Sequence, residues 1–129
     1  MNQHGKQIMQ AIILILEEGH SNEVKEQALC ILSNISAGDS AKEFIMTNDD
    51  ILHKLLSYLG NSNVSLQLAA VECITNLAHH NDEGAAGRQE RLKEFSMPNT
   101  LQKMIACSDP KLSSKARFAL NQFSSSLVK

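Results

Sequence analysis

The sequence is poor in aromatic residues, with no tryptophan, one tyrosine and an aromatic share of 4%. This composition favours helices packed through leucine, isoleucine and alanine over a β-sandwich, whose strands are rich in aromatic and β-branched residues. The longest wholly apolar run, residues 11–16, has six residues, whereas crossing a bilayer takes roughly 20. A basic leader with an apolar segment and a cleavage site is also missing. We therefore expect a soluble intracellular protein that does not bind membranes.

The sequence also lacks the residue groups that carry catalysis or bind metal. The cysteines Cys30, Cys73 and Cys107 have no CxxC spacing, and we interpret Cys73 as a small buried apolar residue, with a redox or metal site as the alternative. His79 and His80 lie in a polar stretch, and neither an HExxH motif nor a phosphate-binding glycine loop is present. We expect no cofactor, no metal and no enzymatic activity. The competing hypothesis is a metal-dependent hydrolase, whose activity a chelator would abolish.

What the sequence does contain is one helical pattern repeated three times. An aliphatic residue is followed by alanine four residues later, an aliphatic residue after four more, and an apolar residue after a further three. Steps of four, four and three follow one face of an α-helix, so each copy predicts an amphipathic helix with that face buried. The copies are Val24, Ala28, Leu32 and Ile35; Leu66, Ala70, Ile74 and Leu77; and Leu112, Ala116, Leu120 and Phe123. Their alanines are 42 (70 − 28) and 46 (116 − 70) residues apart, within the range of roughly 40 to 47 of HEAT and armadillo repeats.

The pattern predicts a single all-α domain over residues 1–129. Residues 6–37 form a partial repeat of two helices, and residues 39–78 form a complete repeat of short, medium and long helices. The polar, glycine-rich residues 79–87 predict a surface loop. Residues 88–124 form a capping repeat, in which Pro98 opens the second helix and Asp109-Pro110 the third.

The first repeat lacks its opening helix, which predicts an exposed apolar edge. This edge includes Ile8 to Leu16 and the first long helix. Because neighbouring repeats of a solenoid bury each other's faces, an uncovered face favours self-association, aggregation or docking of another chain's repeat.

The sequence resembles the armadillo family in both pattern and detail. Glu26–Ile35 reads E-x-A-L-x-x-L-S-N-I, similar to the third helix of an armadillo repeat. The strings HGKQIMQA, EVKEQALCIL, IMTNDDIL and LQLAA resemble the C-terminal end of the armadillo scaffold subunit of the CTLH/GID ubiquitin ligase. This resemblance implies an armadillo-type superhelix of about two and a half repeats. It also implies a non-catalytic protein-binding scaffold that docks a substrate receptor and supports ubiquitin-dependent degradation.

In armadillo proteins the third helices line a concave groove, where an asparagine near the end of each helix bonds the partner's backbone. The resemblance places the groove residues in rows of three. They are Asn34, Asn76 and Gln122; Cys30, Glu72 and Phe118 one turn earlier; Gln27, Ala69 and Lys115 before them; and Glu23, Ser65 and Lys111 first. All lie opposite the buried stripe, so we expect them to be exposed. An amide offers both a donor and an acceptor to an extended peptide. The alternative is that these are ordinary helix-surface residues.

Groove recognition of basic nuclear-import signals uses tryptophan one turn before the asparagine, so we do not expect that activity here.

Charge is unevenly distributed along the chain. Residues 1–86 carry 4 basic and 11 acidic side chains (net −7), whereas residues 87–129 carry 8 basic and 3 acidic (net +5). We hypothesise that Lys111 and Lys115, with Phe118 as an anchor, receive an acidic segment or C-terminal carboxylate of a partner. The alternative is a solvated basic face.

Nucleic acid is not an expected partner, because the net charge is −2 and aromatic platforms are missing. A second functional hypothesis is a structural end cap that stabilises neighbouring repeats and binds no partner itself. Substitutions at Asn76 and Phe118 separate the two hypotheses, because only the groove hypothesis predicts loss of partner binding.

Overall fold

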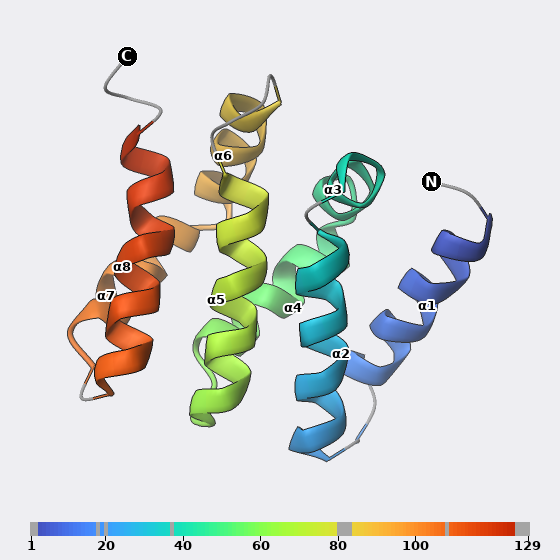
Figure 1. Cartoon of the computed structure of the whole chain (residues 1–129), viewed down its shortest axis with the longest axis horizontal. Helices are drawn as coiled ribbons and strands as arrows, with labels where there is room; N and C mark the ends of the chain where they lie inside the picture. Colours follow the sequence, from blue (N-terminus) through green and yellow to red (C-terminus); the bar gives the residue numbers. More distant parts are fainter. Residues whose placement is uncertain are drawn as a thin grey trace.

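The computed structural model describes residues 3–17, 19, 21–36, 38–79, 84–107 and 109–125. These residues form eight helices and no strand, which confirms the all-α prediction (Figure 1). The helices are α1 (Gln3–Glu17), α2 (Asn22–Ile35), α3 (Asp39–Met46), α4 (Asp49–Leu59), α5 (Val64–Ala78), α6 (Ala85–Glu94), α7 (Met97–Ile105) and α8 (Pro110–Ser125).

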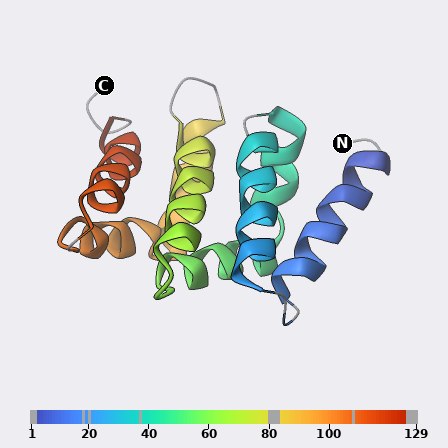
Figure 2. The same cartoon turned by 60° about the horizontal axis from the view of Figure 1, so that its bottom comes forward.

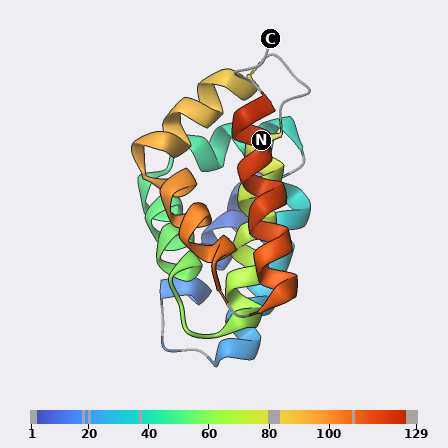
Figure 3. The same cartoon turned by 90° about the vertical axis from the view of Figure 1, so that its left-hand side faces the viewer.

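The helices stack as an armadillo-type solenoid, as the repeat pattern and the resemblance predict. The long helices α2, α5 and α8 stand side by side in one row, and α1 lies beside α2 at the N-terminal edge (Figures 1 and 2). Seen along the stack, α4 and α7 form a second layer, and α3 and α6 lie across one end (Figure 3). Each complete repeat therefore contributes one long helix to the same face of the molecule.

Short polar side chains fix where the helices begin. Asn48, Asn63 and Asp109 each accept a hydrogen bond from the backbone N–H three residues later, at 3.1, 3.1 and 2.8 Å. Ser21 does the same for α2, at 3.3 Å. These bonds satisfy backbone donors that have no partner within the first helical turn. The start of each long helix follows directly from the sequence.

The core is built from the repeated stripe. Its members are buried in all three long helices, except for the partly buried Ile35 and Leu120 and the exposed Val24. The prediction for Val24 is wrong, since this side chain is 37% exposed. Its counterparts Leu66 and Leu112 are buried, and the flank they share faces the preceding long helix. In α2 the same flank faces the N-terminal edge.

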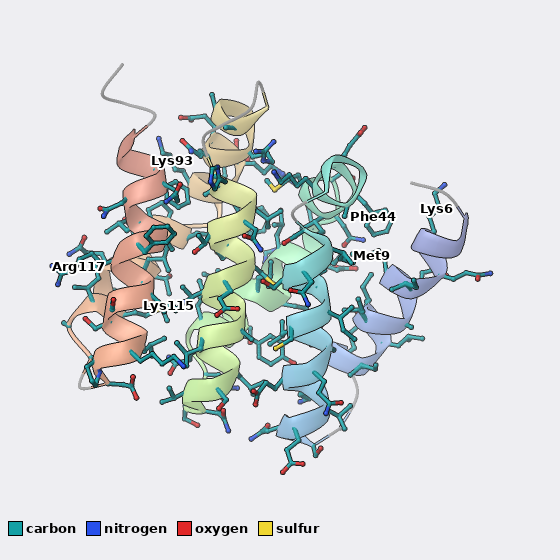
Figure 4. All side chains as sticks on the ribbon, in the orientation of Figure 1. Lys6, Met9, Phe44, Lys93, Lys115 and Arg117 are labelled. Carbon is teal, nitrogen blue, oxygen red and sulfur yellow. The ribbon has the colours of Figure 1, made fainter. Side chains whose placement is uncertain are left out.

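The predicted apolar edge is present. Ile8, Leu14, Val24 and Ile31 are exposed on α1 and α2, whereas Met9, Ile12 and Leu16 of α1 are buried. Met9 of α1 belongs to the buried core, and the partly buried Phe44 of α3 packs against the same core; Figure 4 labels both residues. α1 therefore buries one face and leaves apolar side chains on the outside.

The loop predicted for residues 79–87 extends too far, because its last residues belong to α6, which begins at Ala85. Ala85 is buried, and the side chains of Arg88 and Gln89 are tied to backbone carbonyls of α5. These contacts hold the first turn of α6 in place although glycines flank it. Residues 80–83 and 126–129 of the predicted loop and tail lie outside the described residues.

Candidate functional site

The three long helices present a shared surface, which we call the long-helix face. It consists of exposed residues of α2, α5 and α8: Glu23, Gln27, Cys30, Asn34, Ser65, Glu72, Lys111, Lys115 and Phe118. Parallel helices with the same sequence frame place equivalent residues at the same height. Nine of the twelve side chains predicted to line a groove are therefore exposed together on this face.

Ala69 and Gln122 are exceptions, because both are buried. The prediction of their exposure is wrong, since each lies on the flank of its helix that packs against the preceding long helix. The amide Nε2 of Gln122 donates to the Phe118 carbonyl at 3.4 Å. Helical spacing alone does not distinguish a flank covered by a neighbour from a face open to solvent.

Asn76 takes part in a contact between repeats. It is half-buried, and its Nδ2 donates to the Ser33 carbonyl oxygen at 2.7 Å and to the Ser33 Oγ at 3.3 Å. This amide therefore fastens α5 to α2. Asn34, at the equivalent position of α2, is exposed. The three amides aligned by the repeat thus have three different environments.

Charge changes sign across the long-helix face. Glu23 and the half-buried Glu26 lie on α2, whereas Lys111 and Lys115 lie on α8. Between them, Lys115 Nζ lies 4.0 Å from Glu72 Oε1 of α5, and both side chains are about half exposed. Figure 4 shows Lys115 on the side of α8 toward α5, and Arg117 on the opposite side. The face is therefore acidic at α2 and basic at α8.

Phe118 is the most exposed large apolar side chain among the described residues, at 56%. It lies one turn after Lys115 on the same face of α8. Its counterparts in the other long helices are Cys30 and Glu72. An exposed aromatic ring beside two lysines is a combination that protein interfaces use as an anchor.

Cys30 and Cys73 are poorly suited to nucleophilic chemistry. Although Cys30 is exposed, partial desolvation of its thiol raises the pKa, and the charges of Glu26 and Glu72 raise this pKa further. Burial also raises the pKa of Cys73 well above its usual range, and its thiol donates to the Leu29 carbonyl oxygen at 3.5 Å. Both thiols stay protonated at neutral pH, so they are weak nucleophiles. The interpretation of Cys73 as a buried residue is confirmed.

The sequence analysis missed a set of side chains on α6 that join neighbouring repeats. Arg88 Nε donates to the Leu77 carbonyl at 2.6 Å, and Gln89 Nε2 donates to the carbonyls of Ala78 at 2.6 Å and Gln122 at 3.0 Å. These bonds join the first turn of α6 to the C-terminal parts of α5 and α8. No local pattern marks them, because their partners lie in other helices.

Arg91 of α6 forms a second link between repeats. Its Nε donates to the Met46 carbonyl at 3.2 Å, and its guanidinium pairs with Asp49 and lies 5.2 Å from the centre of the Phe95 ring. α6 is therefore fixed to both α3 and α4 on the side away from the long-helix face.

A hollow of about 420 Å³ lies where the end of α1, the start of α2 and α4 meet. Glu17 and Asp50 oppose Lys25 and Lys54 around it, so its charges balance and indicate no ligand class. Among the residues that the structure describes, no group of three or more His, Cys, Asp or Glu side chains is placed to hold a metal ion. In the same residues, each helix is too short or too polar to span a membrane.

The chain is similar to proteins named Armadillo repeat-containing protein 8. It is 53% identical to that of Danio rerio over 123 residues, which cover 95% of this chain and 18% of that protein. It is 54% identical to that of Mus musculus over 123 residues, with the same coverage. The chain thus spans less than a fifth of the length of these relatives.

Solved structures share the fold. A designed armadillo repeat protein in complex with the peptide (KR)4 superposes with a TM-score of 0.75 at 23% identity, over 87% of this chain and 45% of that one. An engineered protein superposes with a TM-score of 0.73 at 22% identity, over 95% of this chain and 46% of that one. No protein-family model matches the chain.

Proposed function

We propose that the chain, which has an armadillo-type fold and is similar to a segment of Armadillo repeat-containing protein 8, is a non-catalytic scaffold that binds protein partners through its long-helix face. The observation that carries this proposal is Phe118, an exposed aromatic ring beside Lys111 and Lys115. Buried aromatic anchors supply much of the affinity of protein interfaces, and surrounding charges steer the partner. An acidic segment or a C-terminal carboxylate is the partner chemistry that suits these lysines.

The resemblance supports a more specific role in a CTLH/GID-type ubiquitin ligase of the cytoplasm and nucleus. In this proposal the chain contacts other ligase subunits or a substrate receptor, and so supports ubiquitin-dependent protein degradation. Because the chain spans 18% of its relatives' length, the proposal assigns it one contact surface and not the whole assembly.

The test is binding of purified CTLH/GID subunits to the chain, measured by isothermal titration calorimetry at two salt concentrations. We expect Phe118→Ala to weaken binding at least about tenfold, as the loss of a central aromatic anchor does. Replacing Lys111 and Lys115 with Glu should weaken binding and reverse its salt dependence. Lys103→Glu is the matched control, because this exposed lysine lies on α7, outside the face. Unchanged affinity in the Phe118 and double-lysine variants would show the proposal to be wrong.

The polar outer flank of α8 favours a second candidate function, a structural end cap. Arg117 and Asn121 are exposed there, as suits the end of a solenoid. If the chain acts only as a cap, substitutions at Asn76 and Phe118 will leave partner binding unchanged.

A further inference from the structure

Along a row of equivalent residues on the long-helix face, the side-chain charge changes from one helix to the next. The first row contains Glu23 of α2, Ser65 of α5 and Lys111 of α8, one residue from each long helix at the same height. It therefore runs from negative through neutral to positive. Ala69, in the next row, is buried, so α5 presents only a short side chain at the centre of the face.

The electrostatic surroundings of Cys30 support the acidic character of one end. Partial burial raises the pKa of its thiol most, and the negative charges of Glu26 and Glu72 raise this pKa further, so both carboxylates act on this part of α2. The other end has the opposite character, since Lys111 and Lys115 are both exposed on α8. Each end of the face therefore favours a partner group of the opposite sign.

Helix packing sets the distance between the two ends. Packed helices lie about 8–10 Å apart, so α2 and α8, with α5 between them, are separated by roughly 20 Å. An extended chain rises about 3.3 Å per residue and covers this distance in about six residues.

We infer that the long-helix face fits an extended segment with a basic and an acidic residue about six residues apart. The basic residue lies over Glu23 and Glu26 on α2, and the acidic residue over Lys111 and Lys115 on α8. An apolar side chain near the acidic residue packs against Phe118. This inference rests on the proposed function and specifies the chemistry of its partner.

A uniformly basic or uniformly acidic segment is a poorer fit, because one of its ends meets like charge. Like-charge contacts across an interface are unfavourable and exclude wrong partners. At the centre, the charge of Glu72 is partly offset by Lys115 at 4.0 Å, and the half-exposed Lys115 side chain still faces the partner. The ends of the face are therefore what distinguishes between segments.

The experiment measures fluorescence anisotropy of labelled synthetic peptides added to the full chain. One peptide has Lys-Arg and Leu-Asp-Glu groups with their charges six residues apart in a Ser/Ala background; a second is its reversed sequence. Further peptides have a three-residue spacing, only the basic group or only the acidic group. We expect one of the two six-residue peptides to bind at least about tenfold more tightly than all the others.

Charge-reversed variants then test the assignment of the ends. In the variant with Glu23 and Glu26 changed to Lys and Lys111 and Lys115 changed to Glu, we expect the preference to switch to the reversed peptide. Phe118→Ala should weaken the preferred peptide without changing the order of preference. Glu90→Lys with Lys103→Glu is the control, because these exposed residues lie outside the face and should leave both peptides unaffected.

Three outcomes would overturn the inference. Binding that is independent of charge spacing, or equal for the acid-only peptide, would mean that the lysines of α8 act alone. Loss of binding to all peptides, while ligase subunits still require Phe118, would refute the charge pattern but leave the proposed function intact. Light scattering that shows a dimer lost in Phe118→Ala would mean that a second copy of the chain occupies the face.

Discussion

The helices at the two edges of the row, α2 and α8, expose side chains of opposite polarity on their outer flanks. On α2 the flank toward the N-terminal edge carries Val24 and Ile31, and Ile31 is 48% exposed. On α8 the flank toward the C-terminal edge carries Arg117 and Asn121, both exposed. One end of the stack is therefore apolar and the other is polar.

Equivalent positions inside the stack explain the difference. The counterparts of Ile31 are Cys73 and Ala119, which are buried against the preceding long helix. The counterparts of Arg117 are Leu29 and Val71, which are buried against the following one. The backbone is the same at each position, so side chains alone determine whether a repeat accepts a neighbour.

The largest expected effect on stability comes from placing an arginine, the residue found at the outer flank of α8, at the equivalent position inside the stack. Val71→Arg puts a guanidinium between α5 and α8, where Val71 is fully buried. Because an unpaired buried charge costs about 3–5 kcal/mol, we expect most of the stability to be lost. Urea denaturation followed by circular dichroism measures this loss. Arg117→Val is the reverse control, and a similar loss in both variants would contradict the comparison.

The second largest effect on stability is expected at Gln89, which links α6 to the C-terminal parts of α5 and α8. Gln89→Leu keeps the size of a buried side chain but removes its hydrogen bonds to the carbonyls of Ala78 and Gln122. We expect the free energy of unfolding to fall by about 2 kcal/mol, since buried carbonyls lose their donors. Thermal unfolding measures it. Exposed Gln102, on α7, provides the control variant Gln102→Leu, which should differ little from the parent chain.

A smaller effect compares one position in two repeats. Asn76→Ala removes the bond to the Ser33 carbonyl and should cost about 1 kcal/mol. Asn34→Ala changes an exposed side chain and should stay within about 0.5 kcal/mol. Denaturation midpoints of the two variants test the difference. Equal losses would mean that the contact between α5 and α2 contributes nothing measurable to stability.

The smallest effect on stability is expected at the apolar edge itself. Ile31→Lys replaces a half-exposed side chain by a good helix former and should change stability by less than about 0.5 kcal/mol. It should nevertheless reduce self-association of the chain, measured by light scattering over a concentration series. Val64→Lys, at an exposed apolar residue of α5, is the matched control outside this edge. If the parent chain is monomeric throughout, the edge does not drive self-association.

Much of the fold could be predicted because its signals are local. The 4-4-3 stripe and the Asp109-Pro110 helix start each lie within one helix, and the spacing of the alanines relates neighbouring repeats. Burial of Ala116 or Ile74 follows from such a stripe in any solenoid. The fold class therefore required no knowledge of distant contacts.

The details of the site depend on neighbours and were harder to predict. Gln122 and Ala69 match exposed positions by spacing, but the preceding long helix covers them. Nothing in the sequence distinguishes Arg88 from a surface arginine, although its guanidinium donates to the carbonyls of Leu77 in α5 and of His79 after it. Val24 departs from its buried counterparts because the flank it occupies lies at the end of the row. In each case the contact partner, and not the residue type, decides the environment.

The buried Cys73 thiol can report on transient separation of neighbouring repeats in this solenoid. Its thiol lies at the seam between α5 and α2, bonded to the Leu29 carbonyl, and a reagent reaches it only when the two repeats separate. In a stack whose repeats touch only their neighbours, such openings occur seam by seam. The rate at which a thiol reagent modifies Cys73, compared with the exposed Cys30 and Cys107, would therefore count the transient separations of one pair of repeats while the rest of the chain stays folded.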